Sequence, residues 1–143
     1  MSTSPGAIVA EARGLSKHFD GLTAVDGIAF TIRRQECFGF LGPNGAGKTT
    51  TMRMLSCLAR RDGGELSVLG LDPAVDARTV KRRIGVVAQE VNLDLELTVR
   101  ENLLVYARYF DLPRREAARR ADELLGFVEL SDRAQDGVEQ LSG

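Results

Sequence analysis

The eight residues from Gly42 to Thr49 constrain the fold more than any other stretch of this chain. They read Gly-Pro-Asn-Gly-Ala-Gly-Lys-Thr, which matches the phosphate-binding P-loop pattern of a glycine, four residues, then Gly-Lys-Thr. Glycines let the backbone turn tightly and approach a phosphate closely. The N–H groups of such a loop converge on the phosphate at the N-terminus of the following helix, where the helix dipole favours an anion. Lys48 is expected to reach the β- and γ-phosphates, and Thr49 to offer its hydroxyl to Mg²⁺.

The residues on either side of this loop have the character that the pattern requires. Cys37–Leu41 is short, apolar and aromatic, which predicts a buried strand. The segment from Thr50 to Leu58 carries apolar residues at helical spacing and predicts a helix. Cys37 and Cys57 are therefore expected to be reduced thiols in apolar surroundings.

The remaining pattern predicts an α/β chain. The expected strands are 7–19 and 24–33, which form an antiparallel layer around an Asp20-Gly21 turn, together with 65–69 and 84–88. The expected helical segments are 76–83, 98–110 and 113–128. Thr98 and Glu101 form a capping box that marks where the second of these helices begins. The arginines of the last helix alternate with acidic residues, which favours a solvated face.

Composition narrows the classes of protein to consider. The chain has 143 residues, a net charge of −1 and 27% charged residues, so charge gives no case for binding nucleic acid. No apolar run approaches the roughly 18 residues that would span a membrane. Residues 1–6 lack the features of a secretory signal.

Four features in order resemble the ATP-binding subunits of ABC transporters. The first is the strand pair, with Phe19 before the turn. The second is the P-loop in the form Gly-Pro-Asn-Gly-Ala-Gly-Lys-Thr-Thr, and the third is Gln89 after a predicted strand, which matches the Q-loop. The fourth is Leu141-Ser142-Gly143, which matches the start of the Leu-Ser-Gly-Gly-Gln signature. Nearly the whole chain is covered, and the resemblance implies a P-loop ATPase core with an N-terminal antiparallel β layer and a helical subdomain.

The resemblance also implies a set of site residues. Phe19 would stack on the adenine of ATP. The start of the signature, Ser142 and Gly143, would contact the ATP that a partner subunit holds. The phosphates would be bound by the loop and the start of the helix that follows it, which are Gly42, Pro43, Asn44, Gly45, Ala46, Gly47, Lys48, Thr49 and Thr50. Lys48 and Gln89 would act in catalysis, while Thr49 and Gln89 would contact Mg²⁺. In this family two ATP-binding subunits enclose two ATP molecules.

A membrane-spanning permease is the other partner that the resemblance implies. It would be met by the segment from Gln89 to Phe110. The aromatic residues Tyr106, Tyr109 and Phe110 of this segment are expected either to pack inside the helical subdomain, which is the simpler expectation, or to contact the permease. The subunit would then lie in the cytoplasm, on the inner face of the bacterial inner membrane. The segments 89–94, 97–103 and 107–110 resemble the export-type (ABC-2) ATPases, the group that includes nodulation-factor, antibiotic and multidrug exporters.

The family's ATP-binding domain is longer than this chain, so we expect a partial domain. Residues 7–89 would form the β layer, the P-loop and the core strands, and residues 90–143 the helical subdomain up to the shortened signature. The Walker B aspartate, the general-base glutamate and the switch histidine have no counterpart here. We therefore expect these 143 residues alone to bind ATP without effective turnover.

Other classes of protein compete with this interpretation. A DNA-repair or chromosome-organising ABC ATPase would carry a long coiled coil between Lys48 and Leu141, and no sustained heptads occur there. A translation-type tandem ABC ATPase stays open. An unrelated P-loop kinase or GTPase does not account for Gln89 followed by the Leu-Ser-Gly sequence. A non-catalytic nucleotide-binding module is the remaining alternative.

Overall fold

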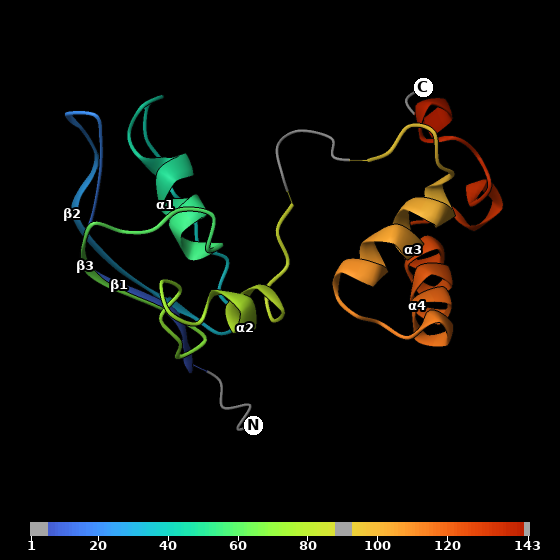
Figure 1. Ribbon diagram of the computed structural model, residues 1–143, viewed down its shortest axis with the longest axis horizontal. Helices are drawn as coiled ribbons and strands as arrows, with labels where there is room; N and C mark the ends of the chain where they lie inside the picture. Colours follow the sequence, from blue (N-terminus) through green and yellow to red (C-terminus); the bar gives the residue numbers. More distant parts are fainter. Residues whose placement is uncertain (1–5, 88–92, 142–143) are drawn as a thin grey trace. The chain divides into compact units, whose positions relative to one another are not determined.

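The chain forms two compact units in the computed structural model, residues 1–86 and residues 87–143. The structure describes residues 6–87 and 93–141. Figure 1 shows a sheet with helices α1 and α2 in the first unit and a pair of helices, α3 and α4, in the second. The expected α/β class with an N-terminal antiparallel layer is confirmed.

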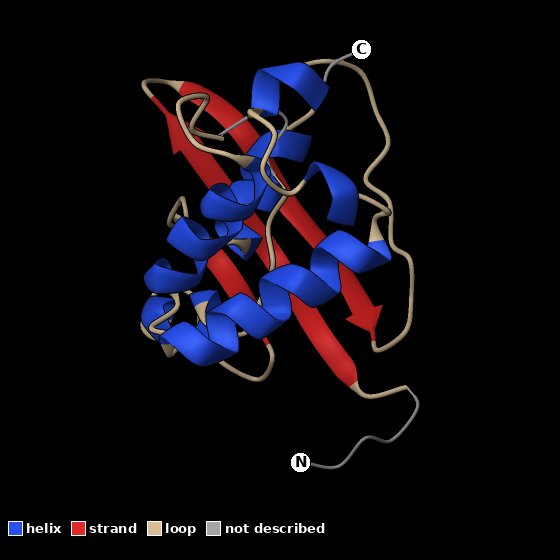
Figure 2. Ribbon diagram, turned by 90° about the vertical axis from the view of Figure 1, so that its right-hand side faces the viewer, coloured by secondary structure: helices blue, strands red, loops and turns tan. Residues whose placement is uncertain are grey.

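The first unit is organised around a long β-hairpin, drawn among the red strands of Figure 2. Strand β1 (Ile8–Phe19) pairs antiparallel with β2 (Leu22–Arg33), as expected. Asp20 and Gly21 both have positive φ, at 40° and 85°, which is what a two-residue turn needs to match the twist of the strands. The register shifts at several points along β1, and this explains why its apolar residues alternate only weakly in the sequence.

Strand β3 (Gly63–Val68) pairs antiparallel with the other edge of β1, which gives the order β2-β1-β3. Gly64 makes this pairing possible because its φ is +74° and a Cβ there would lie 2.2 Å from the carbonyl oxygen of Gly14. Only glycine fits such a close approach between two backbones.

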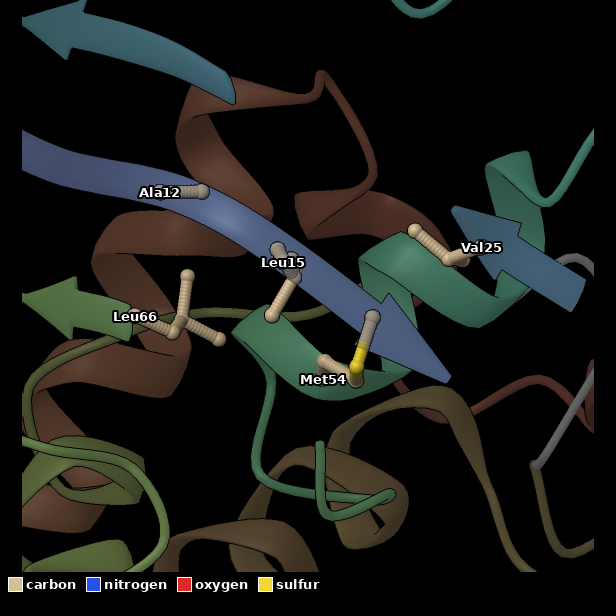
Figure 3. Close-up of a cluster of buried hydrophobic side chains, with 5 residues drawn as sticks. All are labelled: Ala12, Leu15, Val25, Met54 and Leu66. Atoms are coloured by element: carbon tan, nitrogen blue, oxygen red, sulfur yellow. The ribbon is translucent and has the colours of Figure 1, made fainter. Parts of the chain in front are cut away.

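Helix α1 (Lys48–Leu55) packs its buried face against this sheet. Figure 3 shows the resulting cluster, formed by Ala12, Leu15, Val25, Met54 and Leu66. Leu15 and Met54 are fully buried, and each such side chain contributes about 1.5–3 kcal/mol of hydrophobic stabilisation. The core therefore fixes α1, and the loop that precedes it, on the hairpin.

A second buried cluster joins the short helix α2 (Ala77–Lys81) to the sheet through Ala10, Val68 and Val80. The connection before α2 is held by a two-pronged ion pair, in which Arg61 donates to both carboxylate oxygens of Asp72 at 2.6 and 2.8 Å. Asp72 also accepts from the N–H of Ala74. The hydrogen bond from Arg61, followed by that from Ala74, lowers the pKa of Asp72 to about 2.

The second unit contains α3 (Val99–Tyr109), α4 (Arg114–Phe127) and the 3-10 turns Ser131–Arg133 and Val138–Leu141. The predicted capping box is present in full at the start of α3. Arg100 on α3 donates to Asp122 on α4 at 2.8 Å. On α4, Arg119 and Arg120 pair with acidic neighbours on their own helix, so the solvated face is confirmed.

Two expected strands are wrong over the residues that the structure describes. Cys37–Leu41 and 84–87 form no β ladder there, and Leu41 and Val87 are 97% and 100% exposed. Phe38 and Phe40 instead place their rings against Phe30, with centroids 5.8 and 5.2 Å away. The expected apolar setting of Cys37 is wrong as well, because it is exposed, whereas Cys57 is half-buried. An apolar segment becomes a strand only where a neighbouring strand satisfies its backbone, and no described segment does so here.

Candidate functional site

The predicted phosphate loop lies directly before α1, as the sequence pattern requires. Gly45 and Gly47 adopt left-handed backbone conformations, with φ of 84° and 80°. Gly47 is the N-cap of α1, and within the described residues no side chain caps the helix or places an acidic group in its first turn. The N–H groups at this helix start are therefore directed toward a site suited to an anion.

Gly47 also explains how the loop is seated on the sheet. A Cβ at Gly47 would lie 2.2 Å from the carbonyl oxygen of Ala24 and 3.1 Å from Cγ2 of Val25, both on β2. The loop therefore touches the hairpin at the point where α1 begins. Glycine is required there both for its conformation and for the lack of a side chain.

Lys48 closes the loop by folding back over it. Its Nζ donates to the carbonyl oxygens of Gly42 at 2.7 Å and Pro43 at 2.6 Å. A lysine ammonium has three N–H donors, so this arrangement holds the charge at the loop and leaves a donor for a phosphate oxygen. Two loop carbonyls thus orient the one cation of the predicted phosphate cradle.

The residues after Lys48 divide into an exposed and a buried side. Thr49 is exposed, whereas Thr51 is buried and its Oγ1 donates to the carbonyl oxygen of Gly47 at 3.0 Å. The hydroxyl of Thr49 is a hard oxygen donor of the kind that Mg²⁺ accepts alongside phosphate oxygens and water. Among the described residues, no group of three or more His, Cys, Asp or Glu side chains could hold a metal. The donor set fits an ion that is bound chiefly through a nucleotide's phosphates.

Phe19 stands at the end of β1, immediately before the hairpin turn, and is 47% exposed. The Nζ of Lys17 lies over its ring, 5.0 Å from the centroid. Phe19 and the loop belong to the same compact unit, and β2 links them because Val25 pairs with Lys17 and lies beside Gly47. The ring is thus accessible for stacking.

Three predicted site residues lie outside the described residues: Gln89, Ser142 and Gly143. The structure therefore describes the phosphate loop and Phe19, while the Q-loop and the signature stay predictions. Sequence reasoning missed Ala24 and Val25, which support the loop, and Asp62, which holds Lys17. Nothing in the local sequence marks these residues, because their role comes from contacts between distant segments.

The helix start in the second unit differs sharply from that of α1. The first N–H groups of α3 are occupied: Val99 donates to Asp136 O, Arg100 to Ala134 O and Glu101 to Thr98 Oγ1. Asn102, which is 3% exposed, accepts from the N–H of Asp94 at 2.9 Å and donates to the carbonyl oxygens of Asp94 and Thr98. The N–H groups at the start of α3 therefore hold neighbouring segments of the second unit together, whereas no described side chain caps the start of α1.

The far end of α3 carries exposed aromatic residues. Tyr106 and Tyr109 lie edge to face, with their ring centroids 6.0 Å apart. Tyr109 is 76% exposed, and Phe110 is about half exposed. The simpler expectation for these side chains was packing within the helical subdomain, and that expectation is not met for Tyr109.

A P-loop seated on an antiparallel hairpin, with an aromatic residue at the hairpin's end, defines a nucleotide-binding domain. The family model described as "ABC transporter" matches residues 25–143. The chain therefore belongs to the ABC transporter ATP-binding family. Within the described residues, none of the helices is both long and apolar enough for a membrane span.

Similar proteins support this assignment. The chain is 47% identical over 129 residues to a Nod factor export ATP-binding protein I of Burkholderia thailandensis, covering 90% of this chain and 42% of that protein. It is 46% identical over 142 residues to the protein of the same name from Rhizobium leguminosarum bv. viciae, covering 99% of this chain and 45% of the relative. The chain thus spans somewhat less than half the length of these relatives.

Two solved structures have a similar fold. One, described as the ATP binding subunit of an ABC transporter, matches with a TM-score of 0.77 and 28% identity, covering 90% of this chain and 54% of its own. The other is cbiO1 from Clostridium perfringens, part of the ABC transporter complex cbiONQ. It matches with a TM-score of 0.83 and 23% identity, over 95% of this chain and 56% of its own, and supports the fold alone.

Proposed function

We propose that this chain is part of the ATP-binding subunit of an exporter that couples ATP binding and hydrolysis to transport through a separate membrane subunit. The observation that carries the proposal is the uncapped start of α1, with Lys48 held over the loop by two carbonyls. A helix N-terminus that no described side chain caps, beside an oriented ammonium, suits the phosphates of a nucleotide. The high identity to Nod factor export ATP-binding proteins supports export as the direction of transport.

Each residue of the proposed site has a distinct role. The loop and helix start, Gly42 to Thr50, bind the phosphates, and Phe19 stacks on the adenine. Thr49 and Gln89 contact Mg²⁺, which when bound would stabilise the negative charge that develops as the γ-phosphoryl group is transferred. Ser142 and Gly143 contact the ATP held by a second ATP-binding subunit.

The proposed membrane partner is a permease, which meets the segment from Gln89 to Phe110. The exposed rings of Tyr109 and Phe110 support such a contact, because aromatic residues are enriched in protein interfaces. The cbiO1 protein is itself part of a transporter complex. The subunit would then lie at the cytoplasmic face of the bacterial inner membrane. Nucleic acid is not proposed as a partner, given the net charge of −1.

Co-expression of a full-length ATP-binding subunit that contains these residues with a candidate membrane subunit tests the proposal. We expect ATP hydrolysis that the membrane subunit stimulates and that Lys48→Ala lowers at least about 100-fold, as loss of a transition-state charge contact typically does. Lys81→Ala, at the exposed end of α2, is the matched control and should have no effect.

Two other outcomes would favour different functions. ATP binding without turnover in the complex would favour a non-catalytic nucleotide-binding module. Hydrolysis stimulated by nucleic acid or ribosomes, and not by a membrane protein, would favour a non-transport ABC ATPase.

A further inference from the structure

Asp62 holds the end of strand β1 at three successive residues, two through its carboxylate and one through its backbone N–H. Its Oδ1 lies 2.8 Å from the Nζ of Lys17, and its Oδ2 accepts from the N–H of His18 at 2.7 Å. The N–H of Asp62 donates to the carbonyl oxygen of Ser16 at 2.9 Å. We call Asp62 and Lys17 together the Asp62 clamp.

The clamp places a cation against the ring of Phe19. The Nζ of Lys17 pairs with the carboxylate of Asp62 at 2.8 Å and also lies over the ring, 5.0 Å from its centroid. Its side chain is only 14% exposed, which is low for a lysine. The hydrogen bond from Lys17, followed by that from His18, lowers the pKa of Asp62, so the carboxylate is charged at neutral pH. An attraction between a cation and an aromatic face favours one placement of the ring.

The hairpin connects the clamp to the phosphate loop. Lys17 pairs with Val25 across the hairpin, and Val25 lies against Gly47, where the loop meets α1. Asp62 lies in the segment of chain between α1 and β3, so the clamp also joins that segment to the end of β1. The ring of Phe19 is thereby held relative to the loop by contacts within one compact unit.

We propose that Lys17 and Asp62 are positioning residues that orient Phe19 to stack on the base of the bound nucleotide. This inference rests on the proposed ATP site. Lys17 covers one part of the ring, and Phe19 is still 47% exposed, which leaves surface for a planar base. Fixing a side chain before binding removes an ordering cost that would otherwise reduce nucleotide affinity by about 2- to 10-fold.

Comparison of two ligands separates this role from a general structural one. ATP has phosphates and a base, whereas inorganic tripolyphosphate has only the phosphates. Calorimetric titration of the purified protein with each ligand, in the presence of Mg²⁺, should show that Asp62→Asn and Lys17→Met weaken ATP binding by about 2- to 10-fold. Tripolyphosphate binding should stay unchanged. Lys17→Met keeps the apolar stem and removes only the charge.

Two controls sharpen the experiment. Asp122→Asn removes a surface carboxylate that also pairs at 2.8 Å, here with Arg100 in the other unit, and should affect neither ligand. In a Phe19→Ala background, Asp62→Asn should cause no further loss of ATP affinity, because the ring it orients is gone.

The outcomes distinguish the inference from the function on which it rests. If Asp62→Asn and Lys17→Met weaken both ligands equally, or weaken neither, while Lys48→Ala still weakens ATP binding, the role of the clamp is overturned and the proposed ATP site stands. Wild-type protein that binds neither ligand, or binding that is insensitive to Lys48→Ala, would overturn the proposed site and the clamp with it.

Discussion

Replacing Gly47 with alanine tests how the phosphate loop is seated on the hairpin. The left-handed backbone at φ 80° costs alanine about 1–2 kcal/mol. The added Cβ would also lie 2.2 Å from the carbonyl oxygen of Ala24, a backbone atom that cannot rotate away. Cβ contacts essentially never fall below 3.0 Å, so the loop or β2 must shift by nearly 1 Å.

Gly45→Ala is the matched control. Gly45 has almost the same φ, 84°, but a Cβ there would meet nothing within 4 Å. Both variants therefore share the backbone cost, and only Gly47→Ala adds the collision with Ala24. Denaturant unfolding, with calorimetric ATP titration beside it, should show a larger loss of stability in Gly47→Ala by at least about 1 kcal/mol, as overpacking of a filled site does. Equal stability of the two variants would refute the described seating of the loop.

Three further substitutions test other parts of the structure. Asn102→Ala should lower the unfolding free energy by about 1–3 kcal/mol, because the buried Asn102 side chain makes hydrogen bonds with the backbone of Asp94 and Thr98 that alanine cannot replace. Gly64→Ala should strongly destabilise the sheet, since its Cβ would lie 2.2 Å from the carbonyl oxygen of Gly14. Asp72→Asn should make the unfolding free energy less dependent on pH at acidic pH. The folded pKa of Asp72, about 2, is below its usual value of 3.8, so its stabilisation is complete above that value and is lost as the pH falls toward 2.

Each of these has its own check. Asn102→Asp should be at least as harmful as Asn102→Ala, because a carboxylate would then face the carbonyl oxygens of Asp94 and Thr98. Gly63→Ala, where the nearest atom to a Cβ is 3.6 Å away, should be mild by comparison. Urea unfolding from about pH 5 down to pH 3 should show a smaller loss in Asp72→Asn than in the wild type; parallel losses would contradict the role given to that ion pair.

The sequence predicted the structure best where a conformation depends on residues that are close together in the chain. The turn at Asp20-Gly21, the capping box at Thr98 and the loop before α1 all follow from local backbone and side-chain chemistry. These features predicted the elements that the structure contains. The family could also be predicted from the sequence, because the phosphate loop requires particular residues at fixed spacing.

Prediction failed where structure depends on distant partners. Cys37–Leu41 and 84–87 have the composition of buried strands, yet composition does not say which strand would pair with them. Ala24 and Asp62 could not be predicted for the same reason. Ala24 matters because it lies against Gly47, and Asp62 because it pairs with Lys17. Such contacts join segments far apart in the chain, and no local pattern encodes them.

The central claim is that the loop from Gly42 to Thr49 binds the phosphates of ATP through the start of α1 and Lys48. Calorimetric titration of the purified protein with MgATP tests it most directly, with Lys48→Ala and Lys81→Ala compared under the same conditions. The account predicts saturable binding that Lys48→Ala weakens at least about 10-fold, as expected for a lost hydrogen bond between charged groups, and that Lys81→Ala leaves unchanged. Equal affinity in all three proteins would contradict it.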